Sequence, residues 1–163
     1  MTGRVVVVLI LLAALAGGVA MWWLQLYAFY DRVDSIDLTI TEGGTERPLP
    51  TTQIDAITSE SSPIRFRACF TVDDVPVADP HPNPTPLVTP GWFDCFNTGQ
   101  IVTDLETGAA TALMGTRNIK YGIDRVLAVY PDGRGVAWHQ INECGRELFE
   151  GKPPPEGCPP PPD

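Results

Sequence analysis

The sequence has few basic residues for its length and only two histidines. Among 163 residues, 11 are Lys or Arg and 20 are Asp or Glu, so the formal net charge at pH 7 is −9. Nucleic-acid binding depends on clustered Lys and Arg that neutralise phosphates, so this charge balance argues against a nucleic-acid partner. The length excludes large catalytic folds such as the (β/α)8 barrel, which needs about 200 residues or more.

The usual sequence patterns of catalytic, phosphate-binding and metal-binding sites are also missing. The chain has no G-x-S-x-G, no glycine-rich phosphate loop and no C-x-x-C. Zinc and iron–sulfur sites use close-spaced cysteine pairs. The cysteines here lie 26, 49 and 14 residues apart (Cys69, Cys95, Cys144 and Cys158). We therefore expect no cofactor and no metal, and we favour a protein without catalytic activity over an enzyme.

One long apolar run lies near the N-terminal end. Residues 5–29 contain no Asp, Glu, Lys or Arg, and about 20 helical residues suffice to cross the hydrocarbon core of a membrane. Aromatic residues gather at the end of the run, from Trp22 to Tyr30, as they do at membrane interfaces. Arg4 is the only charge among the first thirty residues. The positive-inside rule therefore predicts a cytoplasmic N-terminus and an acidic body across the membrane.

A cleaved signal peptide is the alternative to a retained signal-anchor. Gly18-Val19-Ala20 has the small residues that precede a cleavage point. Hydrophobicity continues beyond it through Trp22-Trp23-Leu24, and cleavage would leave an apolar, aromatic terminus. We therefore favour a transmembrane segment within residues 1–30 that stays in the protein. Both alternatives place the body outside the cytoplasm.

The even number of cysteines agrees with an oxidising compartment, where disulfides persist. Four cysteines allow three pairings. We favour Cys69–Cys95 and Cys144–Cys158, because each bond would close a proline-rich excursion that has little else to hold it. In the chain-entropy model each bond would stabilise the domain by about 3 kcal/mol.

Residue periodicity in the body, residues 31–151, predicts a small β-rich α+β domain. Alternating apolar and polar residues predict strands, and turn residues between two such runs predict a hairpin. Strands are expected at 35–41, 64–72 and 109–114, and a C-terminal hairpin at 122–141 that turns at 131–133. A helix is expected up to Thr107, with Asn97 or Thr98 as its N-cap and Gly108 ending it.

Three other segments are expected to lack strands. Residues 47–62 are polar with few apolar anchors, so we expect a loop with one short helix near residues 54–57. Residues 73–90 contain six prolines, which exclude a helix or a central strand and predict a polyproline-like surface loop. The proline-rich tail, residues 152–163, is expected to be tethered to the domain through Cys158.

His139 is the only histidine inside predicted regular structure and is the main candidate for chemistry. It would act as a general base, a metal ligand or a pH-dependent switch, together with Asp94 or Asp124 if these share a cleft. The alternative, which we favour, is a histidine that is hydrogen-bonded inside the sheet. His81 lies between prolines in the expected surface loop, where nothing would hold it as a ligand.

Five residues are candidates for contact with a partner protein. Large aromatic side chains dominate interface energetics, and Trp92 and Phe93 belong to a dense aromatic run. Tyr121, Asp124 and Arg125 lead into the predicted hairpin and would form a recognition edge. The alternatives are that the aromatic pair belongs to the core and that the charged pair is solvated or paired.

Several short motifs spread along nearly the whole chain carry a family resemblance. They are Leu26–Tyr30, Ser62–Phe70, Pro90–Phe96, Asn118–Val126, Pro131–Gly135, Trp138–Asn142 and Glu156–Pro160. In these motifs the chain resembles a family of uncharacterised single-pass proteins from alpha-class proteobacteria. The resemblance implies a Gram-negative inner-membrane anchor with a periplasmic body, and it implies no established activity.

A histidine kinase label, which members of such families sometimes carry, receives no support from the residues. A kinase needs a helical phospho-accepting histidine and an ATP-binding domain with glycine-rich motifs, whereas His139 lies in a predicted strand. We expect instead a non-catalytic envelope protein, an accessory subunit or assembly factor of an inner-membrane complex with a membrane-protein partner. The alternative is a small periplasmic enzyme or ligand-binding domain that uses His139 with Asp94 or Asp124.

Overall fold

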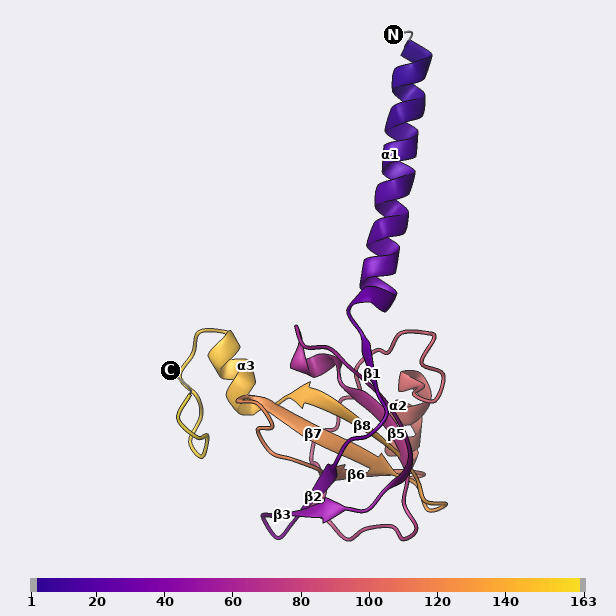
Figure 1. Ribbon diagram of the computed structural model, residues 1–163. Coiled ribbons are helices and arrows are strands. Elements are labelled where there is room, and N and C mark those ends of the chain that lie inside the picture. The colour runs from indigo at the N-terminus through magenta and orange to yellow at the C-terminus, as the bar shows by residue number, and fades with distance from the viewer. Residues whose placement is uncertain (1–2, 162–163) are drawn as a thin grey trace. The chain divides into compact units, whose positions relative to one another are not determined.

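The computed structural model describes residues 3–161, and the chain divides into two compact units between Tyr30 and Asp31. The first unit is one helix, α1 (Gly3–Trp23), which continues as the π-helical turn η1 (Leu24–Ala28) (Figure 1). None of its residues is buried, and its mean hydropathy is 2.7. A helix that is apolar on all sides suits a lipid environment. Residues 3–28 are long and apolar enough to span a membrane, as an anchor or as a signal sequence.

The second unit contains a six-stranded antiparallel sheet and a two-stranded β-hairpin (Figure 1). The sheet order is β1-β4-β5-β8-β7-β6, and β2 pairs with β3. The strands are β1 (Asp31–Val33), β2 (Leu38–Glu42), β3 (Thr45–Leu49), β4 (Thr52–Thr58), β5 (Arg67–Thr71), β6 (Thr111–Met114), β7 (Ile123–Val129) and β8 (Arg134–Ile141). The helices are the 3-10 turn η2 (Pro63–Arg65), α2 (Thr98–Thr107) and α3 (Glu143–Phe149). The α+β class predicted from the sequence is confirmed.

The C-terminal hairpin forms as predicted, and its residues alternate between the two faces of the sheet. Its turn has Gly133 at φ +85°, a conformation that glycine adopts without strain. Across the hairpin, Asp124 pairs with Gln140 and Arg125 pairs with His139. Because side chains alternate along a strand, these two pairs lie on opposite faces of the sheet.

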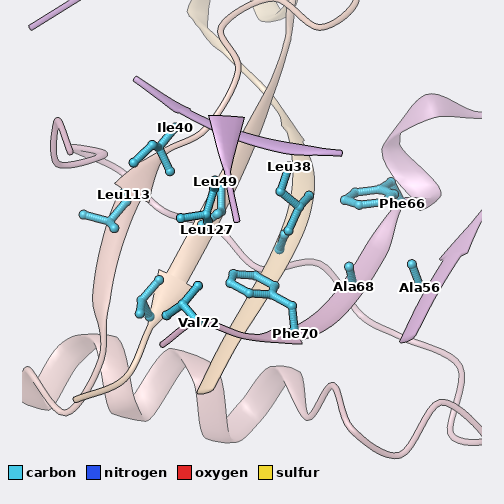
Figure 2. Close-up of a cluster of buried hydrophobic side chains, with 12 residues drawn as sticks. Leu38, Ile40, Leu49, Ala56, Phe66, Ala68, Phe70, Val72, Leu113 and Leu127 are labelled. Atoms are coloured by element: carbon cyan, nitrogen blue, oxygen red, sulfur yellow. The ribbon is translucent and has the colours of Figure 1, made fainter. Parts of the chain in front are cut away.

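The face that carries His139 packs against the β2–β3 hairpin. Figure 2 shows Leu38, Ile40 and Leu49 from this hairpin directed toward Leu127 and Phe70 of the sheet. All five side chains are buried. This cluster supplies much of the apolar burial that stabilises the domain.

The opposite face is covered by the proline-rich segment and the aromatic run that follows it. Phe93 and Phe96 are buried there, and the ring of Phe96 meets that of Trp138 edge to face at 6.4 Å between centroids. Arg67 of β5 pairs with Trp138 and is buried as well. Its guanidinium donates to backbone carbonyls, including those of Leu87 and Val88. The charge is therefore satisfied by carbonyl dipoles.

Two disulfides hold peripheral segments against this unit. Cys69 of β5 is bonded to Cys95 in the aromatic run, and Cys144 of α3 is bonded to Cys158 in the proline-rich tail. These are the pairs favoured from the sequence. Figure 1 shows the chain after α3 curling back beside that helix, as the second bond requires.

The prediction of a loop with a short helix at residues 47–62 is wrong. The structure has strands β3 and β4 there. Thr and Ile supply the strand propensity of β4, and pairing with β1 and β5 on its two sides outweighs its polar composition. Pro48 is tolerated because β3 pairs only with β2 and so forms an edge.

Other boundaries differ less from the predictions. β2 starts at Leu38 instead of residue 35, and the strand expected at 64–72 begins with η2 and is a strand only from Arg67. Helix α2 has the predicted N-cap Asn97 and ends at Gly108. Helix α3 is absent from the sequence-based predictions, although its N-cap, Asn142, accepts a hydrogen bond from the backbone N–H of Gly145 in the usual way.

Replacing Gly145 by alanine is expected to destabilise the domain by about 2 kcal/mol. Alanine normally favours a helix over glycine, but a Cβ at Gly145 would collide with the backbone carbonyl of Gly122. The matched control is Gly99→Ala in α2, where the Cβ would make an ordinary contact of 3.6 Å. Urea unfolding of the full chain in mild detergent measures both variants, and equal free energies of unfolding would contradict the prediction.

Candidate functional site

His139 is buried and fully engaged by neighbouring groups. Its Nε2 accepts a hydrogen bond from Arg125 Nε at 3.1 Å, and its Nδ1 lies 2.6 Å from the carbonyl oxygen of Pro63. Since Nε2 accepts, Nδ1 carries the proton and donates it to Pro63, which makes the imidazole neutral. The ring also packs on that of Phe66, 4.4 Å away between centroids. This geometry fits the structural role favoured from the sequence.

The electrostatic surroundings of His139 keep its ring neutral. Burial lowers the pKa of His139 to about 4; the hydrogen bond to Pro63 opposes this, and the charges of Arg125 and Arg67 add to it. Burial also lowers the pKa of Arg125 to about 10. The guanidinium of Arg125 is compensated by the ring of Phe66 at 4.6 Å and by a hydrogen bond to the carbonyl of Asp37.

Acid is expected to destabilise the domain through His139. Its pKa is about 4 in the folded protein, below the ordinary value of 6.5, so the unfolded chain takes up the proton first as pH falls. The stabilising contribution is present above pH 6.5 and is lost on the way down to pH 4.

The loss in free energy of unfolding attributable to His139 amounts to about 2 kcal/mol between about pH 7 and about pH 5. We expect urea unfolding of the full chain in mild detergent to show this loss, and His139→Gln to reduce it. An identical dependence on pH in both proteins would contradict the assignment and would also remove a pH-sensing role for this histidine.

The structure does not bring His139 together with either candidate carboxylate. Asp124 lies on the other face of the sheet, where its Oδ1 accepts hydrogen bonds from the backbone N–H of Asn118 at 2.8 Å and from Asn142 Nδ2 at 2.7 Å. Asp94 is exposed in the segment tied to β5 through Cys95. The acid–base pair considered from the sequence is therefore not assembled.

Three of the five candidate interaction residues belong to the interior. Phe93, Asp124 and Arg125 are buried, because β7 lies inside the sheet with both faces covered and the aromatic run packs beneath it. Trp92 is half-buried, with the guanidinium of Arg32 5.8 Å from its ring centre.

Part of Tyr121 is exposed to solvent, but its hydroxyl is not. The residue is half-buried, and its hydroxyl is buried with no hydrogen-bond partner in the part of the chain that the structure describes. Of the five candidates, therefore, only Trp92 and Tyr121 present surface that a partner could contact.

A polar cleft lies beside the end of β8, at the open end of the C-terminal hairpin. Its volume is about 600 Å3. Four segments line it: the middle of the proline-rich segment, the stretch from the end of β6 to the start of β7, the end of β8, and α3 with the tail that it holds. The polar and charged side chains of this cleft are His81, Asn83, Thr85, Arg117, Asn118, Asp124, Gln140, Asn142, Glu143 and Arg146.

His81 is held firmly at this cleft, contrary to the sequence-based expectation. Its backbone N–H donates to the carbonyl of Ala112 at 3.0 Å, and its Nδ1 accepts from the backbone N–H of Asn83. Burial lowers the pKa of His81, while the charge of Asp124 raises it and that of Arg117 lowers it. The proline-rich segment is irregular as predicted, but it is bonded to the sheet edge at β6.

Gln140 fixes the same segment from the other side. Its Oε1 accepts from the backbone N–H of Thr85 at 2.7 Å and from Trp138 Nε1 at 2.9 Å, and its Nε2 donates to the carbonyl of Asn83 at 2.9 Å. The contacts with Thr85 and Asn83 span more than fifty residues of sequence, and no local pattern signals them. The only hint in the sequence is the hairpin register, which places Gln140 beside Asp124.

Among residues 3–161, no group of three or more His, Cys, Asp or Glu side chains is arranged to hold a metal ion. The polar groups of the cleft are mainly amides, hydroxyls and guanidiniums, which bind ligands by hydrogen bonds and charge. The chemistry of the lining therefore suits a polar or charged ligand.

The fold and the cleft define a class of protein: a disulfide-linked α+β domain, preceded in the chain by an apolar helix. The chain belongs to DUF6446, a family of unknown function, whose family model matches residues 36–159. The predicted membership of an uncharacterised family is thereby confirmed. No curated protein and no solved structure matches the chain.

Proposed function

We propose that this protein is a non-catalytic, membrane-anchored envelope protein that serves as an accessory subunit or assembly factor of an inner-membrane complex. The main observation behind this proposal is the combination of an apolar helix without a buried residue and a domain in which all four cysteines form disulfides. Disulfides persist in oxidising compartments. This combination supports a domain in an oxidising compartment, and the proposal takes the helix as an uncleaved signal-anchor with a cytoplasmic N-terminus and a periplasmic domain.

The arrangement of the candidate catalytic residues supports a role without catalysis. Both ring nitrogens of His139 are used by Arg125 and Pro63, and Asp124 holds Asn118 and Asn142. These side chains therefore serve the fold.

An exposed apolar side chain in the segment that precedes Trp92 supports a protein contact. Val88 is 83% exposed in the segment just before it, and aromatic side chains next to apolar surface are frequent binding hot spots. A partner that covers Trp92 and Val88 would remove this surface from water, which favours association.

Affinity purification of the tagged full chain, at native expression and in mild detergent, tests this proposal. We expect one inner-membrane protein in stoichiometric amount, and a loss of at least about tenfold in its recovery with Trp92→Ala. Phe149→Ala is the matched control, because Phe149 is an exposed aromatic of α3. A chain recovered alone, or a partner retained equally by both variants, would count against the accessory role.

Mass mapping of the same sample without reductant tests the location of the domain. We expect Cys69–Cys95 and Cys144–Cys158 to be fully bonded in cells. Four free thiols would contradict a periplasmic domain, whatever the purification shows.

A further inference from the structure

We propose that the polar cleft beside β8 is a binding site for a small molecule or chain end that carries a carboxylate. This inference goes beyond the accessory role and does not depend on it. It rests on two features of the cleft. The polar groups of its floor are already hydrogen-bonded within the domain, and the cationic groups at its rim form no ion pair in the described part of the chain.

The floor is preorganised by hydrogen bonds within the domain. Gln140 is bonded to Thr85, Asn83 and Trp138, as described above. Asn142 donates to Asn118 Oδ1 at 2.9 Å and to Asp124 Oδ1, and its own Oδ1 accepts from Gly145. Because these bonds link all four lining segments, the cleft keeps its shape without a ligand.

The rim presents two arginines that have no carboxylate partner. Arg117 and Arg146 are exposed, and neither guanidinium forms an ion pair within 4.0 Å in the described part of the chain. Arg117 lies close enough to His81 to lower its pKa. Guanidinium groups bind carboxylates through two parallel hydrogen bonds, so the rim is suited to an oxyanion.

The charge balance of the chain makes this rim unusual. The protein has a net charge of −9 and only 11 Lys and Arg, yet two of its arginines and one of its two histidines line this one cleft. Asp124 and Glu143 also line it. Their charges offset those of the two arginines, so the cleft has no excess of positive charge to hold a multiply charged anion such as a phosphate ester, and a singly charged carboxylate suits it better.

The size and the amide lining indicate the rest of the ligand. A volume of about 600 Å3 falls in the range of small-molecule sites, roughly 300–1,000 Å3. The side-chain amide of Asn83 and Nδ2 of Asn118, which are not among the paired floor atoms, supply further hydrogen-bonding groups to a polar ligand. A sugar acid and the C-terminal end of a peptide share this chemistry.

An NMR titration of the isotope-labelled full chain in mild detergent tests the site with two acids and their neutral analogues. The probes are D-galacturonate against D-galactose, and N-acetyl-diglycine against its C-terminal amide. We expect at least one acid to shift the side-chain Nε–H signals of Arg117 and Arg146 at low millimolar concentration, and the neutral analogues to have no effect. The acid that binds identifies the source of the carboxylate.

Matched variants locate the binding. Arg117→Gln and Arg146→Gln are each expected to weaken the acid about tenfold, the loss of one charge-assisted contact. Arg134→Gln, at the turn end of the same hairpin and exposed, is expected to leave affinity unchanged. Circular dichroism and unfolding midpoints verify that the variants fold. Absence of a shift with both acids, equal binding of the neutral analogues, or wild-type affinity in both rim variants would overturn the proposal.

Discussion

Removal of the Cys69–Cys95 disulfide by a double alanine substitution is expected to lower the free energy of unfolding by about 3.5 kcal/mol. The bond closes a loop of 26 residues, and without it the unfolded chain gains conformational entropy. The loop carries Phe93 and Phe96 against the face of the sheet that holds Trp138. We therefore also expect weaker packing around Trp138, measured as a smaller near-UV circular dichroism signal.

The second disulfide provides the control for this prediction. Cys144–Cys158 closes a shorter loop of 14 residues between α3 and the tail, and its removal is expected to cost about 3 kcal/mol. Because that bond lies outside the packed face of the sheet, the near-UV signal should persist. Urea unfolding in mild detergent without reductant measures both. A near-UV signal that is lost equally in the two double variants would refute the role assigned to the first bond.

Trp138→Ala is expected to destabilise the domain by about 4 kcal/mol. The side chain is 0% exposed, so its truncation leaves a cavity beside Phe96 and removes the indole N–H that donates to Gln140 Oε1. Gln140 in turn holds the backbone of Thr85. We therefore expect the proline-rich segment to loosen as well, which faster amide exchange at Thr85 would report.

Trp92→Ala is the matched control, because Trp92 is a half-buried tryptophan in the aromatic run. Its truncation is expected to cost less than about 2 kcal/mol, since less apolar area is lost from the interior. Both variants are measured by urea unfolding of the full chain in mild detergent. Comparable losses in the free energy of unfolding for the two variants would contradict the assignment of Trp138 to the centre of the core.

Local patterns in the sequence were sufficient to predict the helices and strands that have a strong hydrophobic periodicity or clear capping and turn residues. The hairpin 122–141 has two alternating runs and a Pro-Asp-Gly turn, and α2 has Asn97 at its start and Gly108 at its end. The same patterns failed for β3 and β4. Those strands are polar, and their stability comes from neighbours far away in sequence, such as the pairing of Ala56 with Ala68.

Residue roles were harder to predict than strands. The sequence favours a structural His139 but does not name its partners, because Pro63 lies 76 residues away. The cleft was missed because its walls come from four separate segments and its lining is polar without a motif. Arg125 was interpreted as a surface residue, since a sequence does not reveal that a charged side chain is covered by Phe66 and the β2–β3 hairpin.

The contact between the proline-rich segment and β6 also limits how this domain can bind other proteins. β6 is the last strand of the sheet, and its outer edge is taken by Asp79 and His81, which accept from Met114 and donate to Ala112. The prolines around them lack backbone N–H groups, so no further strand can continue the ladder there. At that edge the sheet is closed to strand addition from another chain. A partner on this side must therefore recognise side chains, not an extended backbone.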